Sequence, residues 1–194
     1  LFADANSFNG DIAQWDVSSV ANMQGMFANL KLFTCDLSKW DVSSVTDMSF
    51  MFIENYKFNG DISKWDVTRV VSMDSMFMNA SSFNHKLCGA AWVWSKASRS
   101  DMFAGSSGSI CLTPTFPSRA ELRSAVDACL KLSPKGDCAD SPHPIAKWDV
   151  SRVTDMTELL IGPNSFHGDL SEWDVSSVTS MAGMFMRATL FNGD

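Results

Sequence analysis

The stretch Phe58-Asn-Gly-Asp-Ile-Ser-Lys-Trp-Asp-Val-Thr-Arg-Val70, closed by Met76-Phe77, contains the pattern that decides the fold of this chain. Its tryptophan recurs every 25 residues in two runs, and an Asp-Val pair follows it each time. The tryptophans are Trp15, Trp40 and Trp65 in the first run, and Trp148 and Trp173 in the second. One such unit cannot bury its apolar face alone, so the repeat predicts stacked units that share a continuous core.

Each unit is expected to contain one short strand and one short helix. The segment from Asp61 to Val67 has Trp65 and Val67 on one face at a period of two, which is typical of a strand. Thr68 is expected to cap a helix, whose apolar residues recur at helical spacing up to Phe77. We therefore predict an α/β repeat, a leucine-rich-repeat-like solenoid of 25-residue strand–helix units. Its tryptophans are expected in the core rather than on a sugar-stacking surface.

The repeat pattern stops between residues 84 and 147, which divides the predicted solenoid into two arrays. Gly105-Ser-Ser-Gly108 interrupts the first array, and Ser118 with Glu121 forms a capping box that predicts one α-helix in the cap region between the arrays. We expect residues 1–112 to form a first array with a degenerate C-terminal cap, residues 113–147 a helical cap or linker, and residues 148–194 the start of a second array. Because Leu1-Phe2 fills a Met-Phe position and Phe191 opens a further unit, we expect a chain truncated at both ends.

Short motifs within the unit resemble those of a known family of surface proteins. The triplets Thr46-Asp47-Met48 and Thr154-Asp155-Met156 match part of a Trp-Asp-Val-Ser-x-Val-Thr-x-Met repeat. In this they resemble a variant of the BspA-like leucine-rich-repeat surface proteins that is found in mycoplasma-type lipoproteins and in algal and protist proteins. The resemblance implies a right-handed solenoid, a cell-surface or secreted location, and roles in adhesion or binding. It implies no catalytic residues.

The charge of the chain argues against several classes of function. Its formal net charge is −7 and its sequence pI is about 4.8, which argues against nucleic-acid binding, because that function requires a basic surface. No run of 18 apolar residues occurs in it, so no membrane span is predicted. We expect a non-catalytic repeat scaffold for protein or glycan interaction at a cell surface or in the extracellular space. The alternative is a structural rod or subunit of a large extracellular filament, coat or other assembly, whose partners are copies of the chain itself.

The cysteines and one sequon fit an extracellular location. Four of the five cysteines lie between residues 88 and 138, outside the regular repeat and without metal-ligand spacing. We predict the disulfides Cys88–Cys111 and Cys129–Cys138, with Cys35 left free. Asn79-Ala80-Ser81 is an N-glycosylation sequon, so Asn79 is a candidate for glycosylation if the protein is eukaryotic and secreted.

The candidate binding residues are the variable position before each tryptophan and the Asp after it. These partner-facing positions are Gln14, Asp16, Lys39, Asp41, Lys64, Asp66, Lys147, Asp149, Glu172 and Asp174. Each Asp is expected to accept hydrogen bonds from the following turn, although a column of stacked carboxylates also suits a bound cation. A second column is interpreted in the same way: Asp11, Asp36 and Asp61. The histidines are scattered, so no catalytic centre, metal site or cofactor is predicted.

Overall fold

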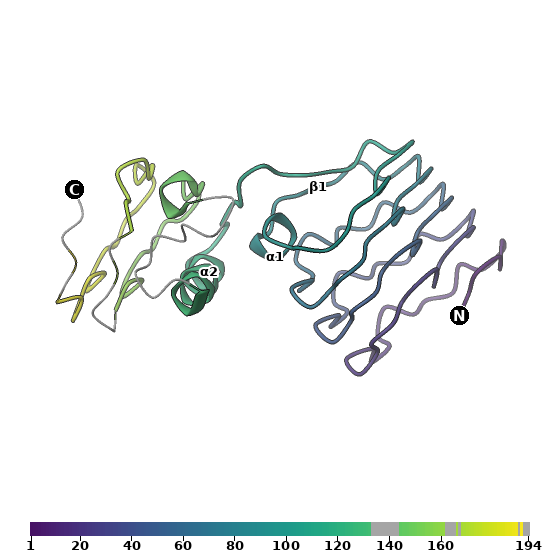
Figure 1. The fold of residues 1–194 in the computed structure, drawn as a ribbon, viewed down its shortest axis with the longest axis horizontal. Coiled ribbons are helices and arrows are strands. Elements are labelled where there is room, and N and C mark those ends of the chain that lie inside the picture. The colour runs from purple at the N-terminus through teal and green to yellow at the C-terminus, as the bar shows by residue number, and fades with distance from the viewer. Residues whose placement is uncertain (133–143, 162–165, 167, 190, 192–194) are drawn as a thin grey trace. The chain divides into compact units, whose positions relative to one another are not determined.

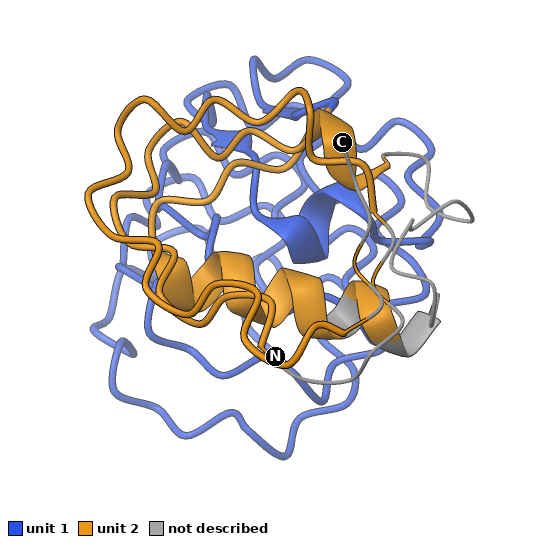
Figure 2. Cartoon of the chain, turned by 90° about the vertical axis from the view of Figure 1, so that its left-hand side faces the viewer, with its two compact units in different colours: residues 1–112 blue, residues 113–194 orange. Residues whose placement is uncertain are grey.

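Helices and strands are few in this protein, for which the structure is a computed structural model (Figure 1). It describes residues 1–132, 144–161, 166, 168–189 and 191. Over these residues the elements are β1 (Lys86–Leu87), α1 (Ala90–Val93), β2 (Ser109–Ile110), α2 (Arg119–Leu132) and the 3-10 helix η1 (Ile145–Lys147). The chain forms two compact units, residues 1–112 and residues 113–194, which Figure 2 colours separately.

The predicted solenoid of strand–helix units is wrong. No residue before Lys86 lies in a helix or a strand, so neither the expected strand from Asp61 to Val67 nor the expected helix after Thr68 forms. Within a unit the backbone amides bond three residues back, as from Met76 to Met73, instead of the four residues that an α-helix requires. Residues with positive φ, such as Ser75, then interrupt the turn before a helix can grow.

Backbone hydrogen bonds between residues about one repeat apart join successive 25-residue repeats instead. In the first unit, the amide of Phe27 donates to the carbonyl oxygen of Met51 at 2.9 Å, and bonds of this spacing recur from turn to turn. Isolated parallel bridges follow the same spacing and join, in order, Asn22, Asp47, Ser72 and Ser98. We call this set of contacts in residues 1–112 the first ladder. Figure 1 shows its turns side by side.

The first ladder imposes a left-handed backbone at fixed positions, whatever residue stands there. One such position is occupied in successive turns by Gly25 (φ 58°), Phe50 (φ 60°) and Ser75 (φ 53°). An L side chain adopts this conformation at a cost, whereas glycine adopts it freely. The contacts between turns therefore override the local preference of Phe50 and Ser75.

This conflict predicts opposite effects for two substitutions. Gly25→Ala is expected to lower the free energy of unfolding by about 1 kcal/mol, and Ser75→Gly is expected to raise it by up to about 1 kcal/mol. An added Cβ at Gly25 would meet only the Cβ of Ala28, at 4.0 Å, so the loss reports backbone conformation and not a clash. Chemical denaturation of both variants measures the effects, and changes of the same sign in the two would contradict this account.

Aromatic side chains that stack from turn to turn form the core of the first unit. The ring centroid of Phe33 lies 6.0 Å from that of Phe58, which lies 6.2 Å from that of Phe83. All three rings are fully buried. The Phe positions of the repeat are therefore core positions, and the backbone ladder encloses them.

The predicted burial of the repeat tryptophans is confirmed for most of them and wrong for Trp15. The buried tryptophans are Trp40, Trp65, Trp148 and Trp173, whereas Trp15 is 46 % exposed. The reason is a hydrogen bond to the neighbouring turn, which Nε1 of Trp40, Trp65 and Trp173 donates to a carbonyl oxygen 28 residues earlier. Among the described residues no such bond is found for Trp15, whose ring centroid lies 5.7 Å from that of Phe2.

Trp92 takes the tryptophan position in the degenerate fourth unit, where the repeat spacing points to Ala90. Its side chain is fully buried, and its Nε1 donates to the carbonyl oxygen of Ile62 at 3.1 Å. Helix α1 carries this side chain inward and begins after Gly89, where a Cβ would lie 2.6 Å from the carbonyl oxygen of Ser63. A short helical turn thus lets Trp92 make the core contact of a repeat tryptophan from a position two residues later than the repeat spacing gives.

The end of the first unit is held by a strand pair and a disulfide. β1 pairs in parallel with β2, and the predicted disulfide Cys88–Cys111 joins the residues that follow them, with Cα atoms 4.8 Å apart. Cys35 is free and half-buried, as predicted. The other predicted disulfide, Cys129–Cys138, stays a prediction because Cys138 lies outside the described residues.

In the second unit, α2 begins where its capping box predicted a helix. The hydroxyl oxygen of Ser118 accepts the amide of Glu121 at 3.3 Å, which supplies an acceptor to the first turn of α2. The turns that follow form a second, shorter set of contacts between repeats. In it the amide of Leu160 donates to the carbonyl oxygen of Met184 at 2.8 Å.

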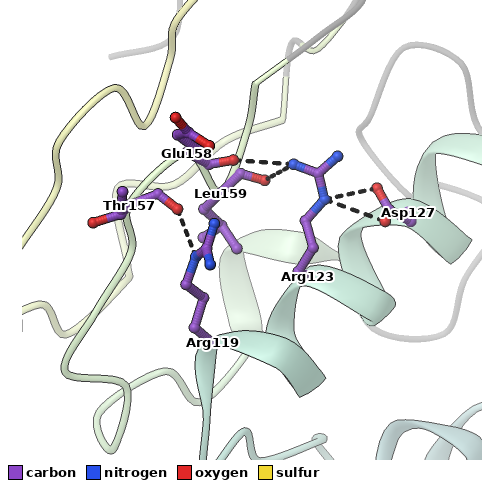
Figure 3. A network of polar contacts seen from close by, with 6 residues as sticks. All are labelled: Arg119, Arg123, Asp127, Thr157, Glu158 and Leu159. Carbon is purple, nitrogen blue, oxygen red and sulfur yellow. Dashed lines mark hydrogen bonds and ion pairs between the residues drawn. The ribbon is translucent and has the colours of Figure 1, made fainter.

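Two arginines of α2 bind the turn at residues 157–159 (Figure 3). Nε of Arg119 donates to the carbonyl oxygen of Thr157 at 2.6 Å. Nη1 of Arg123 donates to those of Glu158 and Leu159, at 3.0 and 2.9 Å. In the first ladder, the carbonyls that match Thr157 and Leu159 accept backbone amides of the preceding turn. Helix α2 therefore caps the second set of turns with side-chain donors in place of backbone donors.

Candidate functional site

The predicted partner-facing residues lie on the surface. The exposed ones are Gln14, Asp16, Lys39, Asp41, Lys64, Asp66, Lys147, Glu172 and Asp174, and Asp149 is half-buried. In the second unit, Lys147 forms an ion pair with Glu172 one repeat away, so the two charges neutralise each other. In the first unit, Lys39 and Lys64 form no ion pair among the described residues, although each is close enough to a carboxylate, Asp36 or Asp61, to interact with it electrostatically.

The Asp that follows each tryptophan holds the next turn by hydrogen bonds. Asp41 accepts the amide of Ser43 at 3.0 Å and its hydroxyl at 2.6 Å. The same amide bond, to the residue two places on, is made by Asp16, Asp66, Asp149 and Asp174. In the second column it is made by Asp11, Asp36 and Asp61. The predicted turn role of both columns is confirmed, and the Ser or Thr that was expected to cap a helix closes this turn instead.

These bonds give the column a testable acid–base property. The hydroxyl of Ser43, and then its amide, lower the pKa of the Asp41 carboxyl because both donate to its charged form. Ser43→Ala is therefore expected to raise the pKa of Asp41 toward the ordinary value of about 3.9. The folded-state pKa is the lower one, so the stabilisation is present above the unfolded-state pKa and is lost as the pH falls through the folded-state pKa.

NMR titration of the Asp41 carboxyl measures this shift. Ser44→Ala is the matched control, because no hydrogen bond joins the Ser44 side chain to Asp41. A pKa for Asp41 that is the same in the Ser43→Ala variant and in the natural chain would exclude the hydroxyl as the cause.

A groove of about 670 Å³ lies on the first unit and is lined by both Lys39 and Lys64. We call it the lysine groove, and its lining residues are Thr34, Asp36, Ser38, Lys39, Lys57, Asn59, Gly60, Asp61 and Lys64. None of them has an aromatic side chain. The groove thus unites two predicted partner-facing lysines with part of the second acidic column.

Sequence reasoning missed Lys57 and Asn59, although the repeat contained a signal for them. Asn-Gly stands at positions 9–10 and 59–60, but Thr34-Cys35 replaces this pair in the turn between them. The lysine groove lies at this replacement, since Thr34 is one of its lining residues. A break in the turn motif, rather than the motif itself, marks the site.

The same replacement leaves one backbone donor in the groove without a protein acceptor. The side-chain oxygen of Asn9 accepts the amide of Thr34 at 3.0 Å, and that of Asn59 accepts the amide of Asn84 at 3.2 Å. Thr34 has a hydroxyl where an Asn would have its carbonyl, and this hydroxyl lies 3.3 Å from the Asn9 oxygen, to which it donates. Among the described residues, no acceptor is found for the amide of Asn59.

The sequon lies on the surface of the first unit. Asn79 is exposed with φ 59°, and Ser81 of the same sequon is exposed as well. The amide of Asn79 donates to the carbonyl oxygen of Ala104 at 2.7 Å, which fixes the backbone and leaves the side chain accessible. Glycosylation at Asn79 stays a prediction.

Two kinds of feature are absent from the described residues. No group of three or more His, Cys, Asp or Glu side chains is placed to hold a metal ion. No helix in the described part of the chain has the length and apolar character that crossing a bilayer requires.

Comparison with known proteins gives one match. Residues 1–110 and 135–194 match the model of a family described as "Mycoplasma protein of unknown function, DUF285". No curated protein and no solved structure matches the chain.

Proposed function

The chain belongs to the DUF285 family of Mycoplasma proteins of unknown function, and from that premise we propose that it is a non-catalytic binding module that acts at a cell surface or in the extracellular space. The disulfide Cys88–Cys111 supports this location, because such bonds persist in oxidising compartments. The finer likeness of Thr46-Asp47-Met48 to BspA-like surface proteins supports it as well.

The observation that carries the proposal is the lysine groove. Its two repeat-related lysines, Lys39 and Lys64, are exposed and carry charges that no described carboxylate pairs with. A rigid ladder of turns holds the residues that line the groove, so a ligand meets polar groups whose backbone is already ordered. Such preorganisation lowers the entropy cost of binding.

Binding of the purified chain to panels of immobilised glycans and extracellular proteins tests the proposal. We expect a ligand whose binding is lost in the Lys39→Ala/Lys64→Ala variant and kept in Lys96→Ala. Lys96 is exposed and lies outside the groove, so it controls for the loss of a surface charge. A panel without any ligand, or ligands that the double variant binds as tightly as the natural chain, would contradict a binding role for the groove.

The alternative role is that of a structural part in an assembly of many copies. Sedimentation velocity over a range of concentrations tests this role, which requires association of the chain with itself.

A further inference from the structure

We propose that the lysine groove binds a linear acidic polysaccharide, whose carboxylate or sulfate groups are held by Lys39, Lys57 and Lys64. This inference rests on the proposed binding function and deepens it by naming the class of ligand. Three observations carry it: the exposed lysines, the carboxylates that accept backbone hydrogen bonds beside them, and a backbone amide for which no protein acceptor is found among the described residues.

The first observation is the arrangement of the lysines. Lys39 and Lys64 occupy the same position in successive turns of the first ladder, and Lys57 lines the groove with them. Adjacent turns of hydrogen-bonded backbone lie about 5 Å apart. The two repeat-related lysines therefore stand at the interval of the repeat, which suits a chain with regularly spaced anionic groups.

The second observation concerns the two carboxylates in the groove. Asp36 accepts the amide of Ser38, and Asp61 accepts the amide of Ser63, each at 2.9 Å. They hold the backbone of the groove, and their remaining oxygen lone pairs can only accept hydrogen bonds. A sugar chain offers hydroxyl donors between its anionic groups and can satisfy them, whereas the side chains of a run of Asp or Glu residues offer carboxylates and no donor.

The third observation is the amide of Asn59. Asn59 lines the groove, and Thr34 has no side-chain carbonyl to accept its amide, unlike the Asn at the equivalent positions. Backbone amides beside ammonium groups form good sites for oxyanions, because a charged acceptor strengthens the hydrogen bond. No aromatic side chain lines the groove, whereas protein partners are often anchored by aromatic side chains.

Calorimetric titration of the whole chain tests the inference with four probes. They are a short oligogalacturonate, which carries carboxylates, a heparin-type oligosaccharide, which carries sulfates, a neutral glucan of equal length, and a polyglutamate peptide. We expect at least one of the two acidic sugars to bind, and the two probes together show whether carboxylate or sulfate is preferred. The affinity is expected to fall by about tenfold or more from low to physiological salt, because the contacts are ionic and exposed.

The variants separate the contributions of the groove. Lys39→Ala/Lys64→Ala is expected to weaken binding by about tenfold or more, and Lys96→Ala to leave it unchanged. Thr34→Asn supplies an acceptor for the amide of Asn59, so it is expected to weaken binding without lowering the thermal stability. Thr34→Ser keeps the hydroxyl and leaves the amide free, so it is the matched control and retains the affinity.

Each contrary result has a distinct meaning. Tighter binding of polyglutamate than of either acidic sugar, or equal binding of the sugars by the natural chain and the double lysine variant, would overturn the inference. Binding of the neutral glucan alone, if lost in the double variant, would overturn the acidic class of ligand and leave the proposed binding function standing. If none of the four probes binds, the inference fails, and the glycan and protein panels then decide on the binding function separately.

Discussion

Replacing Trp65 with Ala is expected to lower the free energy of unfolding by about 3–5 kcal/mol. Its side chain is 2 % exposed, and its Nε1 donates to the carbonyl oxygen of Leu37 in the preceding turn at 3.0 Å. The substitution leaves a cavity in the aromatic core and removes one of the two donors to the carbonyl oxygen of Leu37, which still accepts the amide of Trp40. Since every turn rests on its neighbours, the loss is expected across the first ladder and not at one turn alone.

Trp15→Ala is the matched control for this effect. The two tryptophans occupy the same position of the repeat, but Trp15 is 46 % exposed and lies against the partly buried Phe2. We expect its loss to cost less than half as much as that of Trp65. Urea unfolding monitored by circular dichroism measures both variants, and equal losses in the two would mean that burial in the ladder does not set the contribution of the tryptophan.

The period of the sequence predicted which positions are buried, but it did not predict the backbone that connects them. A spacing of three to four apolar residues, as from Met73 to Phe77, is typical of an α-helix. Here the same spacing arises from tight turns that place Met73, Met76 and Phe77 in one core. The hydrogen bonds run between turns about one repeat apart, and nothing in a single unit reveals this, because the partner residues lie in the neighbouring unit.

The positions where the repeat fails were also harder to predict, for steric reasons. The repeat spacing points to Ala90 in the fourth unit. Trp92 fills the core instead, because it lies in the short helix α1, which directs its side chain inward. This depends on the close approach of Gly89 to the carbonyl of Ser63, which no spacing rule contains. By contrast, the start of α2 was predictable, since the capping bond from Glu121 to Ser118 is local in the sequence.

The candidate site was predicted in part for the same reason. Lys39 and Lys64 were identified because they stand at a position of the repeat where the residue type varies from unit to unit. Lys57 and Asn59 belong to the groove through the folding of the turn around Thr34, which is visible only in three dimensions. Periodicity therefore predicts columns of residues, whereas the hollows between columns depend on where the regular turn is replaced.

Removing the disulfide in the Cys88→Ser/Cys111→Ser variant is expected to lower the free energy of unfolding by about 3 kcal/mol, chiefly because the unfolded chain gains freedom. The bond closes a loop with a sequence separation of 23 that contains α1 and Trp92. It also fixes the strand pair at the end of the first ladder, where the amide of Cys111 donates to the carbonyl oxygen of Leu87 at 3.2 Å.

Amide hydrogen exchange is the suitable measurement, because it resolves the loss along the chain. We expect β1, β2 and α1 to exchange faster in the double variant, with smaller changes around Phe27 and Phe52 in the middle of the ladder. Cys35→Ser is the matched control, since Cys35 is free and half-buried, and it is expected to exchange like the natural chain. If β1, β2 and α1 exchange at the same rate in the double variant as in the natural chain, the stacked turns hold this end of the ladder without the covalent bond.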